Sequence, residues 1–160
     1  MAKDFIKDYK VNVTGVVILE EFYQYIKNWF DHQGYGFDEP SYRELQQGKK
    51  KTIMIRWTYD KKYNDYIKQK IDINLAIKDA EEVKTKKKTA YQATIEMAIT
   101  CYLDKDYEGT WENNKITKLL REIYDKFASN LNEMQRSSDE LKKDGENFYN
   151  EIKAYLHVTQ

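Results

Sequence analysis

A chain of 160 residues has room for one domain, and a hydrophobic content of 41%, including the 14% that is aromatic, can fill one core. The 27 basic and 27 acidic side chains cancel, which excludes a net field that draws the whole molecule to nucleic acid or to an anionic membrane. A single cysteine, Cys101, excludes an internal disulfide and favours a reducing compartment. We expect one domain over residues 1–160, cytoplasmic and without a membrane span.

The first predicted elements are a strand and a helix. Hydrophobic residues at every second position of 9–14 predict a short strand. From Leu19 the hydrophobic spacing lengthens to three and four residues, which predicts an amphipathic helix over 17–33. The glycines within 34–36 suit the left-handed conformation that commonly closes a helix.

Alternation returns after Pro40 and continues through the middle of the chain. It predicts a weak strand around 41–45 and three long strands within 52–59, 67–77 and 89–103. Each has one apolar and one polar face, which is typical of an antiparallel sheet covered on one side, and the short connections favour pairing in sequence as a meander. The last strand would span about 50 Å if fully extended, so we expect a bend or bulge inside it.

Helices are predicted after the last strand. Asn113 or Asn114 can cap a first helix whose apolar stripe runs to Phe127, and the polar stretch 129–138 indicates a break. A capping-box pattern at Ser137 then predicts a second helix over 139–157. The order of strand, helix, four-stranded meander and helices predicts an α+β domain with its helices packed on one face of the sheet.

Three segments carry a family resemblance: the opening MAKDFIKDYKVNVTG, the helix YIKNWFDHQGYG, and YLDKDYEGTWENNKITKLLREIYDKF over 102–127. Over nearly the whole chain the sequence resembles a family of small, mostly archaeal proteins of unknown function. The shared features are diffuse rather than catalytic. The resemblance implies a single cytoplasmic domain and an archaeal source, and it implies no activity, cofactor or site residue.

The chain contains no motif that names a reaction. It lacks a nucleophile elbow, a glycine-rich phosphate loop and a paired-histidine metal motif, so the sequence supports no enzyme class, without excluding one, and we expect no cofactor. His32 and His157 lie in different predicted helices and are expected to be exposed rather than metal ligands. Cys101 lies in the apolar register of its strand, so we expect it to pack in the core.

Carboxylates follow the last strand in alternation. Asp104, Asp106 and Glu108 would share one side of an extended chain, where they could hold calcium or magnesium. The spacing and turn glycine of an EF-hand loop are missing, so a solvated strand exit is the better explanation. Glu96 is a further acidic residue on the polar face.

Lysines gather at one end of the predicted sheet, because successive hairpin loops alternate between its two ends. Arg56, Lys68 and Lys70 on the polar face could extend this basic end toward a protein or RNA partner. Solvated loop tips that keep the sheet edge soluble explain these lysines better than an anionic partner does. The lysines assigned to this end are Lys49, Lys50, Lys51, Lys84, Lys86, Lys87 and Lys88.

A second hypothesis places a small apolar ligand between the sheet and the C-terminal helix, as in helix-grip domains. The order of elements allows it, and aromatic residues in the apolar register would line the cavity, although the same residues suit a packed core. These residues are Trp57, Tyr59, Tyr91, Phe127 and Tyr155.

Overall fold

The computed structural model of the chain describes residues 2–37, 41–84, 88–105 and 120–158, with the side chains of 3–37, 41–84, 88–105 and 132–157. The α+β class is confirmed, as are the helix that follows the first strand and the strands of the meander. The elements are β1 (Ala2–Val17), α1 (Leu19–His32), β2 (Gly36–Phe37), β3 (Ser41–Gln47), β4 (Lys50–Lys62), β5 (Ile67–Val83), β6 (Ala90–Lys105) and α2 (Leu120–Val158).

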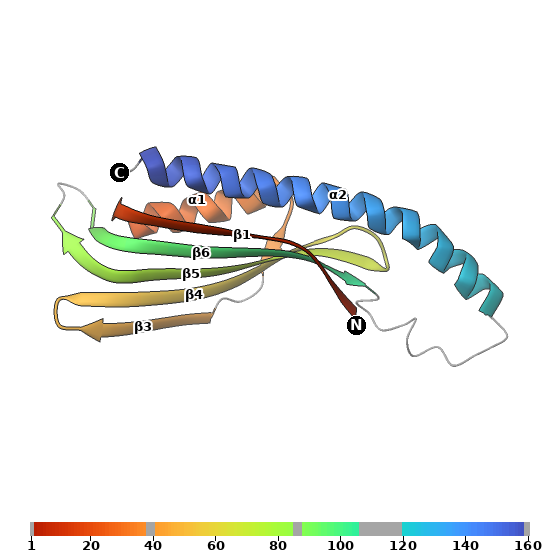
Figure 1. The fold of residues 1–160 in the computed structure, drawn as a ribbon, viewed down its shortest axis with the longest axis horizontal. Coiled ribbons are helices and arrows are strands. Elements are labelled where there is room, and N and C mark those ends of the chain that lie inside the picture. The colour runs from red at the N-terminus through yellow and green to blue at the C-terminus, as the bar shows by residue number, and fades with distance from the viewer. Residues whose placement is uncertain (1, 38–40, 85–87, 106–119, 159–160) are drawn as a thin grey trace.

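The strands form one antiparallel sheet in the order β1, β6, β5, β4 and β2, and β3 pairs with another stretch of β4 on the same side as β2. Strands β3 to β6 therefore pair in sequence, as the meander predicts, and β1 joins the far side of β6. Figure 1 shows the strands side by side from β1 to β3, with α2 running along the molecule beside α1. Strand β2 has two residues, too few for an alternation to predict it.

Both helices pack on the apolar face of the sheet. Helix α1 covers β4, where Phe30 stacks on Tyr59 with ring centroids 3.9 Å apart and Tyr23 meets Trp57 edge to face. Helix α2 contacts β1, β6 and β5. Helix α1 ends as predicted, because Gly34 has a φ of +83° and lets the next amide donate to the carbonyl of Phe30.

Helix α2 is one continuous helix of 39 residues, so the predicted break over 129–138 and the capping box at Ser137 are wrong. Ser137 is fully buried inside the helix, where its hydroxyl donates to the backbone oxygen of Met134 at 2.9 Å. Gln69 of β5 donates to the backbone oxygen of Ser137 at 3.0 Å. The helix start predicted at 113 or 114 lies outside the described residues. The face that α2 turns to the sheet consists of Met134, Ser137, Leu141, Gly145, Phe148, Ile152 and Leu156.

The bulges lie in the two strands that pair with β6 and not in β6 itself. Of the two alternatives expected for β6, the bulge is therefore wrong and the bend stays a prediction. The pairing slips by one residue at Ile6 of β1 and again in β5 between Lys78 and Glu81. Asp79, in the second bulge, has a φ of +52°, a left-handed conformation that aspartate tolerates better than most residues. Strand β1 extends well beyond the predicted 9–14, because its charged first half continues the pairing with β6 past the bulge.

Gly145 allows α2 to lie close against the sheet. A Cβ atom at this position would lie 2.6 Å from Sγ of Cys101 and 3.3 Å from Cε2 of Tyr9. Cys101 is fully buried, as predicted for a core residue, and burial raises the pKa of its thiol to about 12. The thiol therefore stays protonated and acts as a packing group.

We expect Gly145→Ala to lower the free energy of unfolding by about 1–3 kcal/mol, because the added methyl overpacks the contact with Cys101. Without that clash, alanine would be favoured in a helix by about 1 kcal/mol. Cys101→Ala removes the opposing sulfur, so in denaturant unfolding the double variant should lose less than the sum of the two single losses. Exposed Asn147 on the same helix is the control, and Asn147→Ala should change stability by less than about 0.5 kcal/mol. Strictly additive losses would contradict this contact.

Candidate binding groove on the uncovered sheet face

The face of the sheet opposite the helices carries a groove of about 630 Å³. It follows two rows of paired residues across five strands, and at about 4.8 Å between strands each row spans roughly 19 Å. Ala76 and Ala98 form a low floor near the centre, and longer side chains stand on both sides of them. One row is Lys10, Ala98, Asn74, Arg56 and Ser41, and the other is Asn12, Glu96, Ala76, Met54 and Arg43.

Basic side chains line the groove. Among the described residues Lys10 and Arg43 have no ion-pair partner, and the Arg56 side chain is 65% exposed with Nη2 3.8 Å from Asp72. Glu96 is the acidic residue among the described residues of the lining, and Lys78 neutralises it at 2.7 Å. The groove therefore combines an apolar floor with cations that remain available to a ligand.

A polar cluster beside the groove holds Asp72 in place. Its Oδ1 accepts a hydrogen bond from Thr58 at 2.8 Å and one from the Tyr102 hydroxyl at 3.3 Å. Burial, followed by the charge of Asp72, raises the pKa of Tyr102 well above its ordinary value, so this phenol remains a donor. Asp72 is thus fixed next to Arg56 and orients that side chain at the edge of the groove.

The lysine end predicted from the sequence lies away from the groove. Lys50 pairs with Glu81, so the turn after β3 lies beside the end of β5. Lys88 forms an ion pair with Glu21 of α1 at 2.8 Å. The exposed lysines here are Lys49, Lys50, Lys84 and Lys88, while Lys86 and Lys87 lie outside the described residues.

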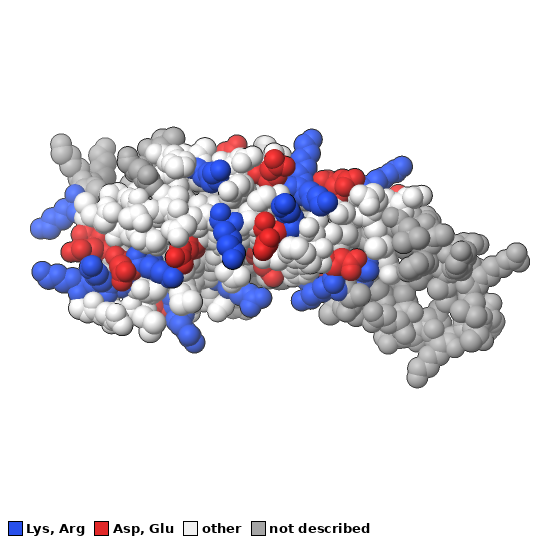
Figure 2. Space-filling view, viewed as in Figure 1, with Lys and Arg blue, Asp and Glu red and all other residues white. Residues whose placement is uncertain are grey.

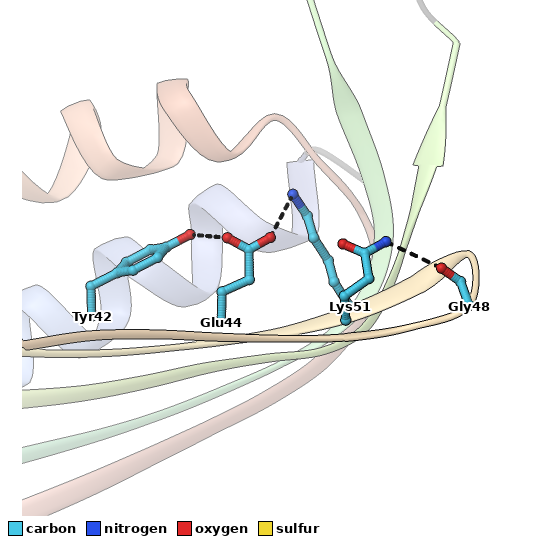
Figure 3. Close-up of polar contacts among 5 residues, drawn as sticks. Tyr42, Glu44, Gly48 and Lys51 are labelled. Carbon is cyan, nitrogen blue, oxygen red and sulfur yellow. Dashed lines mark hydrogen bonds and ion pairs between the residues drawn. The ribbon is translucent and has the colours of Figure 1, made fainter.

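Lys50 and Lys51 lie in β4 and not in a loop, which corrects their predicted setting. Figure 3 shows Tyr42, Glu44 and Lys51 rising from the same side of the two strands. Glu44 accepts a hydrogen bond from Tyr42 at 2.8 Å and lies 3.4 Å from the Lys51 ammonium, which is also 4.5 Å above the Tyr91 ring. The hydrogen bond with Tyr91 is the main cause that raises the pKa of Lys51. Lys51 is engaged within the protein and is not an open anion-binding group.

Lys68 and Lys70 lie on the uncovered face toward the other end of the sheet. Lys70 forms an ion pair with Asp104 at 3.4 Å, and Asp104 is only 2% exposed. The solvated strand exit considered for Asp104 is therefore wrong. Asp106 and Glu108 lie outside the described residues.

The aromatic residues of the ligand-cavity hypothesis take part in packing. Trp57 and Tyr59 are buried in the core, and Tyr155 stacks on Tyr25 with ring centroids 4.5 Å apart. Tyr91 contacts Lys51. Because the side chain of Phe127 lies outside the described part of the chain, a cavity at that position stays a prediction.

His32 and His157 lie exposed near the ends of α1 and α2. Within the described ranges no three potential metal ligands cluster, and no helix there is long and apolar enough to cross a membrane. Comparisons with family models, curated proteins and solved structures found no match to this chain. The archaeal family resemblance therefore stays a prediction.

Sequence reasoning found Arg56 but missed most of the groove. Lys10 and Arg43 lie on strands that the alternation identified only weakly or in part. The signal that was present is Ala76 and Ala98, two small residues in the polar register of neighbouring strands. The two alanines are recognised as a common floor only when the pairing makes them diagonal neighbours on adjacent strands.

Proposed function

We propose that this chain is a binding domain that takes an acidic protein segment in the groove on its uncovered sheet face. The observation that carries the proposal is the apolar floor of Met54, Ala76 and Ala98 bordered by Lys10, Arg43 and Arg56. Arginine and methionine are enriched where proteins meet proteins. A segment with carboxylates flanking small apolar side chains satisfies both the floor and the cations.

RNA is less well matched to the same surface. Single strands are usually held by aromatic side chains that stack on bases, and no described residue lining the groove is aromatic. Figure 2 shows basic and acidic side chains interspersed over the face in view, without a continuous basic area for a phosphate backbone. These features favour a protein partner.

The test is a titration with fluorescent peptides in which glutamates alternate with small apolar residues. Their lysine counterparts and single-stranded RNA serve as rival probes. Lys10→Glu/Arg56→Glu reverses two charges of the groove and should lower the affinity for the glutamate peptide about tenfold or more. Lys142→Glu/Lys143→Glu makes the same charge change on exposed residues of α2 and should leave binding unchanged. The melting temperature of each variant shows whether it is folded. If charge reversal prevents folding, Lys10→Gln/Arg56→Gln removes the same two charges with a smaller change.

If Lys10→Glu/Arg56→Glu and Lys142→Glu/Lys143→Glu weaken binding of the glutamate peptide equally, the groove is not the binding site. RNA binding that falls steeply with salt and is lost in the groove variant would replace the protein partner with nucleic acid. Loss of binding on changing Lys49, Lys50 and Lys84 to glutamine, with no loss in the groove variant, would move the site to the lysine end.

A further inference from the structure

Strand β3 is an edge strand with nothing paired on its outer side among the described residues. It bonds to β4 on one side only, and all seven of its residues are exposed. An unpaired edge presents a row of free N–H and C=O groups to any chain that can add a strand. This edge is therefore a ready surface for strand pairing.

Exposed apolar side chains gather along the same edge. The described residues include five large hydrophobic side chains that are exposed, and Phe5 on β1 is the one that lies elsewhere. The four at this edge are Phe37 of β2, Tyr42 and Leu45 of β3, and Met54 of β4 directly beside β3. Their exposed fractions range from 46% for Met54 to 57% for Tyr42. Clustered exposed apolar groups mark interaction sites more often than scattered ones do.

The opposite edge of the sheet is protected. Strand β1 carries a bulge at Ile6, contains two Lys-Asp pairs in its first half, and packs against α2. Asp4 forms an ion pair with Lys105 of β6, with 2.8 Å between Oδ2 and Nζ. Bulges and edge charges are the usual ways in which proteins block strand addition. Strand β3 pairs with β4 without a bulge and carries two charged residues, Arg43 and Glu44.

We infer that β3 pairs antiparallel with β3 of a second copy of this chain, about a two-fold axis at Leu45. A two-fold contact uses the same edge of both copies and closes on itself. A parallel pair of β3 strands cannot be two-fold, because equivalent residues would then lie opposite each other on different faces of the sheet. Opposed residues in an antiparallel pair share a face, so the axis must pass through a residue of β3 and not between two residues.

The charges of β3 select Leu45 among these residues. An axis at Arg43 places two guanidinium groups opposite each other, and an axis at Glu44 does the same with two carboxylates; both arrangements are unfavourable. An axis at Tyr42 or Gln46 leaves fewer residues of β3 paired. With the axis at Leu45, five residues pair without a like-charge contact: Leu45 with its counterpart, Arg43 with Gln47, and Glu44 with Gln46.

Glu44 suits this register. Its carboxylate already binds Tyr42 and Lys51 on the helix side of the sheet, and the hydrogen bond from Tyr42, followed by the charge of Lys51, lowers its pKa (Figure 3). Leu45 lies on the uncovered face diagonally next to Met54, so the junction buries apolar side chains of both copies. Because the axis is perpendicular to the joined sheet, the grooves of the two copies open on the same side.

Sedimentation velocity on the full chain over a range of concentrations tests the association, and dimers are expected. Leu45→Lys puts two ammonium groups face to face at the axis and should weaken the dimer about tenfold or more. Phe5→Lys makes the same change at an exposed position on β1 and should leave the dimer intact. A monomer at every concentration, or a dimer lost in Phe5→Lys and kept in Leu45→Lys, would overturn the inference.

Disulfide trapping tests the register. Leu45→Cys places two thiols on opposed residues whose Cα atoms lie about 4.5–5.5 Å apart, within reach of a disulfide, so mild oxidation should give covalent dimers. Arg43→Cys faces Gln47 of the partner and should not cross-link, and Cys101 is fully buried and does not compete. Cross-linking through Arg43→Cys in place of Leu45→Cys would overturn the register. The groove variant Lys10→Glu/Arg56→Glu should dimerise normally, so failure of peptide binding and failure of dimerisation are distinguishable.

Discussion

Phe30→Ala is expected to lower the free energy of unfolding by about 3–5 kcal/mol, which for a chain of this size lowers the melting temperature by roughly 6–20 °C. Phe30 is fully buried where α1, β4 and α2 meet. Its ring stacks almost parallel on Tyr59, with centroids 3.9 Å apart, and lies 4.7 Å from that of Phe148. Truncation leaves a cavity between three elements, and they cannot fill it without shifting from their packed positions. Denaturant unfolding followed by circular dichroism measures the loss.

Phe37→Ala is the matched control for this prediction. Phe37 also contacts the Tyr59 ring, at 5.4 Å, but it is 53% exposed on β2. Its removal should cost less than about 1 kcal/mol, because little apolar area returns to water. Similar losses for the two variants would show that the junction around Phe30 is not a packed core.

The strands of the meander and helix α1 were predictable because their signals are local. Alternation over 52–59, 67–77 and 89–103 predicts that one face of each strand is buried, regardless of which strands become neighbours. The end of α1 was predictable for the same reason, because Gly34 takes a conformation that favours glycine. Local chemistry is enough for elements of this kind.

Bulges and the groove were not predictable because they depend on pairing between strands. The slips at Ile6 and Asp79 shift what lies opposite β6 by one residue. The groove rows join residues that are far apart in sequence, such as Lys10 and Arg56, and only the complete register aligns them. Ala76 and Ala98 were visible as small residues on the polar face, but no single strand shows that they form a common floor.

The continuity of the C-terminal helix was not predictable from polarity, because small polar residues can occupy core positions of a helix. Ser137 is polar in sequence, but in the helix its hydroxyl bonds to the turn before it and its small side chain fits beneath Gln69. Gly145 serves the same purpose against Cys101. Small residues at core positions let α2 lie flat on a sheet whose strands carry large ones.

Ser137→Pro is expected to lower the free energy of unfolding by about 3 kcal/mol or more and the melting temperature by at least roughly 6 °C. Residue 137 lies in the interior of α2, where proline removes the amide donor and its ring clashes with the carbonyl of Glu133. A proline in a surface loop over 129–138 would cost much less. Thermal unfolding monitored by circular dichroism therefore distinguishes a continuous helix from two helices with a break.

Ser137→Ala is the control that separates the backbone from the hydroxyl. It removes the bond from the Ser137 hydroxyl to the Met134 carbonyl but keeps the backbone oxygen to which Gln69 donates. Alanine favours the helix more than serine does, so the change in stability should stay within about 1 kcal/mol. If the proline variant is as stable as the alanine variant, α2 is interrupted at this position; if only proline destabilises the protein, the continuous helix is required to cover the sheet.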